Sequence, residues 1–317
     1  MSYNVTVEVL DRFSSRLHIN TALNLVINIP TMYLIIFHSS KPMGYYKYYL
    51  LYSVVTTFIM DLHQSVVYGV YFLFPSMIHC CLGYCRYLGP VWGPQVNFLI
   101  LNLNTCIMGV GLFSLVAYRY CSVYGKLKWF ESKYSLLSVF VFGVVYCIPI
   151  AVILILAMFN QSKEELLEIA NEEVPEYVSV VQMENCVSTK TRSLGYIYIG
   201  VTAIHVGFID SLAFFLSFKT VALLKSMKNS FSKSTYAAQK QLLITLLLQM
   251  LIPIFTIIIP IAIIIFFRDC SPPNDIARPS QRTYNNGNYQ ALQGCIEEVY
   301  QKSTCFLIIG ISSEENL

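Results

Sequence analysis

Two acidic side chains stand inside otherwise apolar stretches of the chain, and they are the first candidates for chemistry. Asp61 and Asp210 lie in segments that contain no lysine or arginine. A carboxyl group in such surroundings is neutral, paired or beside an ion, because an unpaired buried charge is costly. Asp61 can therefore hold a cation or a water network, move a proton, or act as an intramembrane polar switch. A protonated or water-bridged carboxyl with a purely structural role explains the residue equally well.

Other polar residues of these stretches repeat at helical spacing, which places them on one stripe of each helix. Such stripes are expected where helices close around a shared interior, and hydrogen bonding between helices is their more ordinary role. The alternative is that they contact a bound ligand. The candidates for ligand binding are Asn97, Asn104, Tyr198, Thr202, His205 and Thr256.

Signatures of catalysis and of resident cofactors are missing from the sequence. There is no HExxH pair, no glycine-rich phosphate loop and no serine nucleophile elbow. The clustered cysteines have neither a histidine partner nor a second CxxC pair, so zinc is not favoured. We therefore predict no enzyme, no catalytic residue, no metal site and no cofactor.

Cysteines in two separate segments predict a disulfide. Cys80, Cys81 and Cys85 precede one apolar stretch, and Cys186 lies in a polar segment farther along. Any of the three can bridge to Cys186 if both segments face an oxidising compartment. Cys85 is the preferred partner and Cys81 the next, although spacing does not decide between them. Three later cysteines can pair with one another: Cys270, Cys295 and Cys305.

The composition explains why these residues must be positioned by membrane helices. The chain has 317 residues, of which 56% are hydrophobic and 12% charged, with a mean hydropathy of +0.57. Soluble domains carry about twice that share of charge, so the sequence predicts an all-α integral membrane protein. The net charge of +3 is too small to suggest a nucleic acid as a partner.

Six apolar runs are long enough to cross a bilayer as helices, each about 20 residues or more. They follow an N-terminal segment of residues 1–16 and form a predicted transmembrane bundle over residues 17–267. The predicted spans are 17–37, 48–74, 95–118, 134–159, 194–218 and 242–267.

Charges between the spans predict the orientation. The segments after the first, third and fifth spans carry eleven basic residues and one acid, whereas the 160–193 segment carries seven glutamates. The positive-inside rule therefore places the N-terminus outside the cell. Two sequons, at Asn4 and Asn160, fall on the predicted outer face and are candidate glycosylation sites.

Two segments resemble a known receptor family. The first is KPMGYYKYYLL at 41–51, followed by Met-Asp-Leu-His at 60–63. The second is STYAAQK at 234–240, which leads into a Gln…Ile-Pro helix at 249–253 and then Pro260. Both are similar to segments of the nematode serpentine chemoreceptors, most closely class I and next class H. The resemblance covers residues 17–267.

The resemblance implies a rhodopsin-like seven-helix bundle at the plasma membrane, with a sensory-neuron cilium as the expected location. Such a receptor detects a small external ligand and signals to a heterotrimeric G protein. Arg119 takes the position of the arginine at the inner end of the third helix, but Tyr118 replaces the acid that precedes it in rhodopsin-like receptors. The lysines implied to face the G protein are Lys225, Lys228, Lys233 and Lys240. Contact with membrane lipid headgroups explains the same lysines.

The last fifty residues depart from this family pattern. In residues 268–317 the apolar run extends over 303–311, and nine helical residues span about 14 Å. A seventh crossing is therefore doubtful, and a truncated receptor unable to signal is one alternative. A polytopic transporter or channel is the other, although we find no internal repeat in the sequence to support it.

Overall fold

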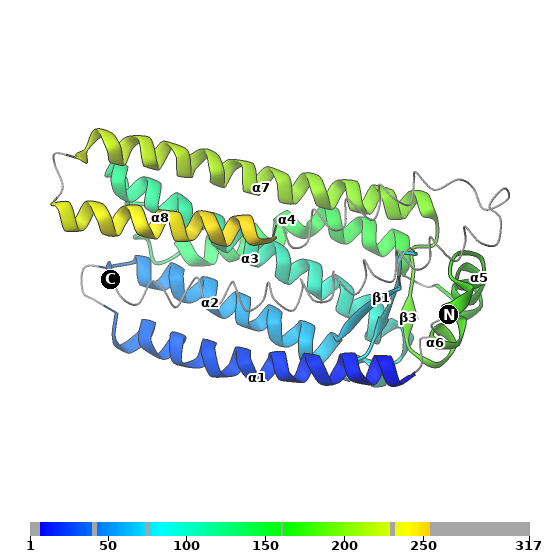
Figure 1. Cartoon of the computed structure of the whole chain (residues 1–317). Helices are drawn as coiled ribbons and strands as arrows, with labels where there is room; N and C mark the ends of the chain where they lie inside the picture. The colour runs from blue at the N-terminus through cyan, green and yellow to red at the C-terminus, as the bar shows by residue number, and fades with distance from the viewer. Residues whose placement is uncertain (1–6, 40–42, 74–75, 160, 229–231, 254–317) are drawn as a thin grey trace, which may run out of the picture.

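Within the part of the chain that the structure describes, six long helices form the body of the fold. The computed structural model describes residues 7–39, 43–73, 76–159, 161–228 and 232–253 (Figure 1). A π-helical turn, η2 (His63–Tyr68), prolongs the second helix, and another, η4 (Val91–Gln95), leads into the third. The helices are α1 (Val7–Phe37), α2 (Tyr46–Leu62), α3 (Val96–Tyr124), α4 (Ser135–Met158), α7 (Arg192–Ser226) and α8 (Lys233–Pro253).

The bundle is that of a multi-pass membrane protein. Five of the described helices are long and apolar enough to cross a bilayer: Phe13–Phe37, Tyr46–Tyr68, Val91–Tyr124, Ser135–Met158 and Ser193–Ser226. The sixth predicted span, 242–267, is described as far as Pro253 in α8. The possible seventh lies outside the described residues. The predicted fold class, an all-α membrane bundle, is confirmed.

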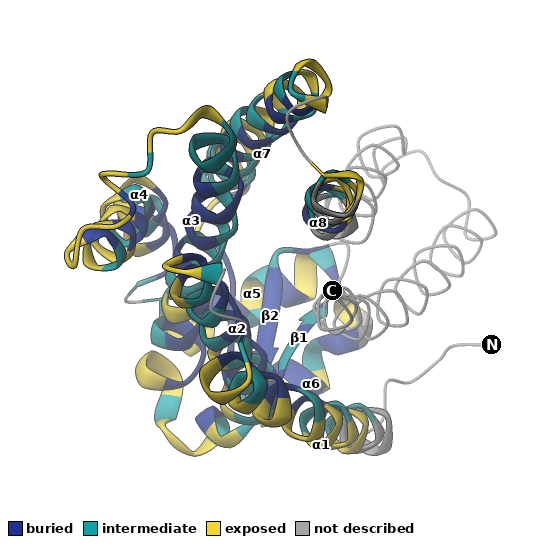
Figure 2. Ribbon diagram, turned by 90° about the vertical axis from the view of Figure 1, so that its left-hand side faces the viewer, coloured by how far each residue is buried: buried dark blue, intermediate teal, exposed yellow. Residues whose placement is uncertain are grey.

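In contrast to a soluble protein, this bundle exposes large apolar side chains on its outer surface and buries polar ones between its helices. Large apolar side chains of α4 such as Leu137, Val145 and Leu156 are exposed, as suits contact with lipid (Figure 2). Asn24 and Asn28 of α1 are instead buried, at 1% and 2% exposure. The polar stripes thus face the helix interfaces, where neighbouring helices can satisfy them.

A small folded unit, here called the lid, covers one end of the bundle (Figure 1). Its antiparallel sheet has the order β1-β2-β3. Apolar side chains of α5 and α6, among them Leu166 and Val180, pack with Leu73 and Ile78 of the sheet. The elements of the lid are β1 (Val70–Leu73), β2 (Ile78–Cys81), α5 (Lys163–Glu173), α6 (Val178–Met183) and β3 (Cys186–Val187).

The start of α5 follows from a short sequence signal. The Ser162 hydroxyl accepts a hydrogen bond from the backbone N–H of Glu165, and the Glu165 carboxylate accepts one from the backbone N–H of Ser162. This capping box satisfies two N–H groups that a helix start leaves unpaired.

The hairpin of the lid corrects the predicted second span, which was expected to run over 48–74. The helix ends at Tyr68, because Gly69 adopts a left-handed φ of +54° and the chain then turns into β1. A side chain at Gly69 would meet the backbone nitrogen of Gly83 at 2.6 Å. Two glycines therefore let the hairpin lie directly against the helix end.

The opposite end of the molecule, here called the basic end, holds the chain turns after Phe37, Tyr124 and Ser226 (Figure 1). Lys126, Lys128 and Lys133 lie in the second of these turns, and Lys225 and Lys228 stand next to the third. The lid and the lysine-rich turns thus lie at opposite ends of the helices.

Candidate functional site

Aromatic rings from four elements of the chain meet beneath the lid. His79 of β2 lies against Phe98 of α3, with ring centroids 4.2 Å apart. Tyr68, at the end of η2, is 6.4 Å from each of these rings. The ring of Tyr198 in α7 packs against that of Phe98, with ring centroids 5.9 Å apart. The lid thus inserts an imidazole among the lid-facing ends of the helices. We call these four residues, together with His63, the lid cluster.

Polar atoms of the lid cluster are buried without a hydrogen-bond partner among the described residues. They are Nδ1 of His63, Oη of Tyr68 and Nε2 of His79. The rings of His63 and Tyr68 are 6.0 Å apart. A buried polar group without a partner costs about 1–3 kcal/mol, so several in one place indicate a position for a ligand or bound water.

The imidazole of His79 is uncharged at neutral pH. Burial lowers the pKa of His79 to about 3, although a hydrogen bond to the backbone of Met77 acts in the opposite direction. The neutral ring has one protonated and one unprotonated nitrogen. It can therefore exchange a hydrogen bond with a neutral molecule.

Two of the predicted ligand-binding residues form hydrogen bonds with other residues of the protein. Asn97 donates from Nδ2 to the carbonyl oxygens of Trp92 and Gly93, at 2.7 and 2.8 Å, and its Oδ1 lies 3.0 Å from Nε2 of His63. The hydroxyl of Tyr198 donates to Oδ1 of Asn102 at 2.9 Å. Asn97 thus orients His63, and Tyr198 joins α7 to α3.

The remaining candidates are dispersed. His205 faces α4, where its ring lies 4.8 Å from that of Tyr146, and its Nδ1 is 2.9 Å from the carbonyl of Val201. Thr202, one turn earlier on α7, and Asn104 on α3 are partly buried. Thr256 lies outside the described residues.

Asp61 lies at the interface of α1 and α2. The Ser65 hydroxyl donates to the backbone carbonyl of Asp61, and Thr21 of α1 donates to Ser65 at 2.7 Å. Asn24 follows Thr21 by about one turn on α1, and Asp61 of α2 precedes Ser65 of η2 by about one turn. Oδ2 of Asp61 and both amide atoms of Asn24 are buried without a partner among the described residues. The second acid, Asp210, is half-buried on α7.

At the basic end, Arg119 joins three helices. Its guanidinium carbon lies 3.5 Å from the ring centroid of Tyr46 in α2, well within cation–π range. Its Nη1 donates to Oε1 of Gln239 in α8 at 3.4 Å, a long hydrogen bond. The preceding residue, Tyr118, packs its ring against that of Tyr46 at 5.4 Å. Arg119 is thus held by an aromatic ring and a neutral amide.

Four lysines lie exposed near these contacts. Lys225 belongs to the last turn of α7, and Lys228 follows it. Lys233 and Lys240 belong to α8, the helix that also carries Gln239. All four side chains are exposed, so a partner approaching the basic end can reach them.

The disulfides differ from the preferred prediction. Cys186 is bonded to Cys80, and Cys85 is bonded to Cys81. The register of the sheet explains the choice, because Cys80 stands directly opposite Cys186 across β2 and β3. Neighbouring residues of a strand point to opposite faces, so Cys81 is directed elsewhere. Bridging of one of the three cysteines to Cys186 is confirmed, but Cys85 as that partner is wrong.

Several predictions concern residues that the structure does not describe. Both sequon asparagines, Asn4 and Asn160, belong to this group, as do Cys270, Cys295 and Cys305. Their roles stay predictions.

Sequence reasoning missed four of the five residues of the lid cluster, namely His63, Tyr68, His79 and Phe98, and it also missed Asn102, the partner of Tyr198. His63 and His79 were not candidates because a single histidine carries no spacing signal. Asn102 pairs with Tyr198, whereas the heptad pattern had selected Asn97 and Asn104. Asn102 lies one turn after Phe98 on α3, and this spacing places the two residues on the same face of the helix. The spacing does not indicate that this face meets α7.

Comparison with known proteins supports one family. The profile described as serpentine type 7TM GPCR chemoreceptor Srh matches residues 10–271. This is class H, the second of the two classes that the motifs resemble. No curated protein matches the sequence.

Proposed function

Because the chain belongs to the Srh family of serpentine seven-transmembrane GPCR chemoreceptors, we propose that it detects a small external ligand and signals to a heterotrimeric G protein. Chemoreceptors of this kind are not a class of enzymes. We further propose that the chain resides in the plasma membrane, with its N-terminus outside, and that a sensory cilium is its site of action.

The distribution of charge supports this orientation. The turns at the basic end collect lysines, and the segment that includes α5 of the lid collects glutamates. Positive-inside bias favours the lysine-rich end in the cytosol, so the lid faces outward. The two disulfides of the lid agree with an oxidising outer compartment.

The lid cluster is the proposed ligand site. His63, Tyr68 and His79 supply polar atoms that have no hydrogen-bond partner among the described residues, and Phe98 supplies an aromatic wall. Neutral donors and acceptors among aromatic rings suit a small uncharged organic molecule with one or two hydrogen-bonding groups. Among the residues predicted from sequence, Asn97 and Tyr198 then act by positioning His63 and Phe98.

The contact of Arg119 with both α2 and α8 is the observation that carries the signalling proposal. A G protein can enter the basic end only if the helix ends separate there, and separation of α8 from α3 breaks the Arg119–Gln239 bond. A ligand that favours the separated state shifts the population toward it. The exposed lysines Lys225, Lys228, Lys233 and Lys240 then border the G-protein surface.

Mutation of Gln239 tests this proposal. The full chain is expressed with a promiscuous G protein, and second-messenger output is measured without added compound. Gln239→Leu removes the acceptor and is expected to raise basal output roughly twofold to fivefold, since one long hydrogen bond contributes about 0.5–1 kcal/mol. Gln241→Leu, at an exposed position of the same helix, is the matched control. Equal basal output of both variants at equal surface delivery contradicts the proposal.

Asp61 is proposed as a polar switch between α1 and α2. Among the described residues, Oδ2 of Asp61 and both amide atoms of Asn24 are buried without a hydrogen-bond partner, which supports an interface that can take a second hydrogen-bonding arrangement. Asp61→Asn is then expected to change evoked signalling more than surface delivery. Equal loss of both readouts assigns Asp61 a structural role and removes the switch.

A further inference from the structure

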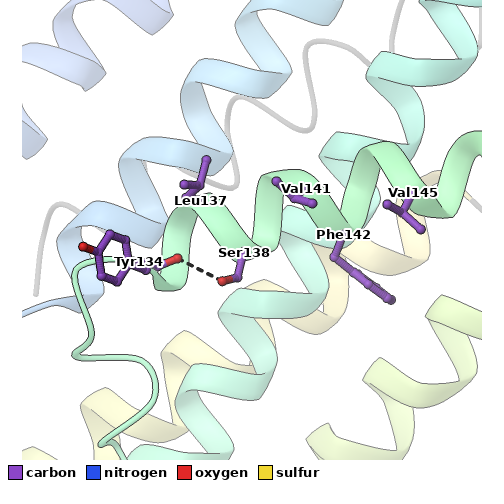
Figure 3. A pocket seen from close by; sticks show the side chains of 6 residues that line it. All are labelled: Tyr134, Leu137, Ser138, Val141, Phe142 and Val145. Carbon is purple, nitrogen blue, oxygen red and sulfur yellow. Dashed lines mark hydrogen bonds between the residues drawn. The ribbon is translucent and has the colours of Figure 1, made fainter.

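A groove opens on the lipid-facing side of the bundle near the basic end. It lies between α3 and α4 and has a volume of about 410 Å³. Val110, Phe113 and Ala117 form its wall on α3, Phe142 lies on α4, and Trp129 closes the end nearest the turn. A second hollow runs along the surface of α4 and shares Ser138 and Phe142 with the groove (Figure 3).

The polar side chains that line the groove already have hydrogen-bond partners within the protein. The two serines that line it are Ser114 and Ser138, and each is satisfied within its own helix. Ser114 donates to the carbonyl of Gly111 at 2.6 Å, and Ser138 donates to that of Tyr134 at 3.0 Å. The walls therefore suit a hydrocarbon chain.

A positive charge stands at the mouth of the groove. Lys126, Lys128 and Lys133 all lie within four residues of Trp129, and Glu131 is the single acid of the same turn. Lys126 and Lys133 lie over the rings of Tyr124 and Tyr134, at 5.1 and 4.9 Å. Among the described residues, none of these lysines is paired with a carboxylate.

The turn holds these groups in place. Phe130 is 6% exposed, and its backbone carbonyl accepts hydrogen bonds from Tyr49 and Ser135. Its ring packs edge-on against those of Tyr49 and Trp129, at 5.5 and 4.8 Å. Trp129, half exposed at 52%, is thus fixed where the apolar groove meets the lysines.

We propose that the groove between α3 and α4 binds one anionic phospholipid, with an acyl chain against Trp129 and the headgroup phosphate among Lys126, Lys128 and Lys133. Both parts of the site match this molecule, since apolar walls receive the chain and the turn supplies positive charge. The inference is independent of signalling, because neither the lid cluster nor the Arg119 contact takes part in it.

The two tryptophans of the chain make the test specific. Trp92→Phe leaves Trp129 as the only tryptophan, so its fluorescence reports on the groove. This variant is placed in two series of phosphatidylcholine nanodiscs that contain increasing mole fractions of a brominated lipid. The lipid is phosphatidylserine in one series and phosphatidylcholine in the other, and the bromine atoms on its acyl chains quench tryptophan fluorescence. Brominated phosphatidylserine is expected to quench Trp129 at a severalfold lower mole fraction.

Two variants that remove the same number of charges distinguish a specific headgroup site from general electrostatic attraction to the basic end. Replacing Lys126, Lys128 and Lys133 by Gln is expected to abolish the severalfold preference for phosphatidylserine. Replacing Lys225, Lys228 and Lys233 by Gln, around the turn after Ser226, is expected to preserve it. Ala117→Phe, which fills the groove, is expected to weaken quenching by both lipids.

Three results overturn the proposal. Equal quenching by the two lipids removes the headgroup site, and equal effects of the two triple variants reduce it to the general charge of the basic end. A retained lipid preference with lost G-protein activation in the Lys126, Lys128 and Lys133 variant assigns this turn to the G protein instead. Nanodiscs expose both leaflets alike, so the lipid result does not depend on the proposed orientation.

Discussion

His79 carries a polar ring from the lid into the end of the helical bundle. It is 1% exposed, and the rings of Phe72 and Phe98 lie on it at 5.6 and 4.2 Å. Such a position excludes charge, whereas the unfolded chain accepts a proton near the ordinary histidine pKa of 6.5. The residue therefore makes stability depend on pH.

The pH prediction has a definite sign. Because the folded pKa of His79 lies near 3, the unfolded state binds a proton first as the pH falls below 6.5, and the folded state loses stability. The loss reaches about 2 kcal/mol at pH 5, since one pKa unit corresponds to about 1.4 kcal/mol. The melting temperature of the purified full chain should fall between pH 7.5 and 5.

Two variants check that His79 is the cause. His79→Phe keeps an aromatic ring and should flatten the pH dependence. His18→Phe, on an exposed position of α1, should leave it unchanged. A His79→Phe slope equal to that of the native chain would contradict the assignment.

The hydrogen-bond partner of an individual residue could not be predicted from the sequence. A polar stripe indicates that a residue faces another helix, but not which atom it meets there. Asn97 and Tyr198 were selected correctly as interior residues, and they bond His63 and Asn102. Their roles depend on how far each helix is rotated and shifted, which is set by packing between helices.

At the scale of elements, apolar runs predicted the helices but not the lid. The expected run 134–159 closely matches α4, whereas α7 extends well beyond 194–218 because helical backbone continues past the hydrocarbon layer. The strand Val70–Leu73 is as apolar as the helix before it, so hydropathy alone joined the two. The boundary depends on Gly69, whose left-handed backbone ends the helix.

The sheet register makes a testable statement about the disulfides. Cys85→Ser should free Cys81 for alkylation and leave the Cys80–Cys186 bond intact, because β2 and β3 still hold those residues opposite each other. Peptide mapping without reduction measures this. Cys106→Ser, which removes a free and half-buried thiol, is the control and should leave both bonds in place. Alkylation of Cys186 in Cys85→Ser would contradict the pairing.

For the whole molecule, composition was the most informative property. Few charges and long apolar runs predicted a membrane bundle, and two short motifs predicted the receptor family that the Srh profile identifies. The candidate site was less accessible, because it forms where a hairpin, a π-helical turn and two helices meet. Such a meeting of distant segments has no periodic signature in the chain.

We propose that the chain responds to an external compound by activating a G protein. The most direct measurement applies a panel of small uncharged alcohols, ketones and heteroaromatic compounds to cells that express the full chain, and records G-protein activation and uptake of each compound together. We predict activation by some member of the panel without uptake, and raised output before any compound is added in Arg119→Ala, because that variant also removes the Arg119–Gln239 bond. Uptake that persists without a G protein would contradict the account and favour a transporter.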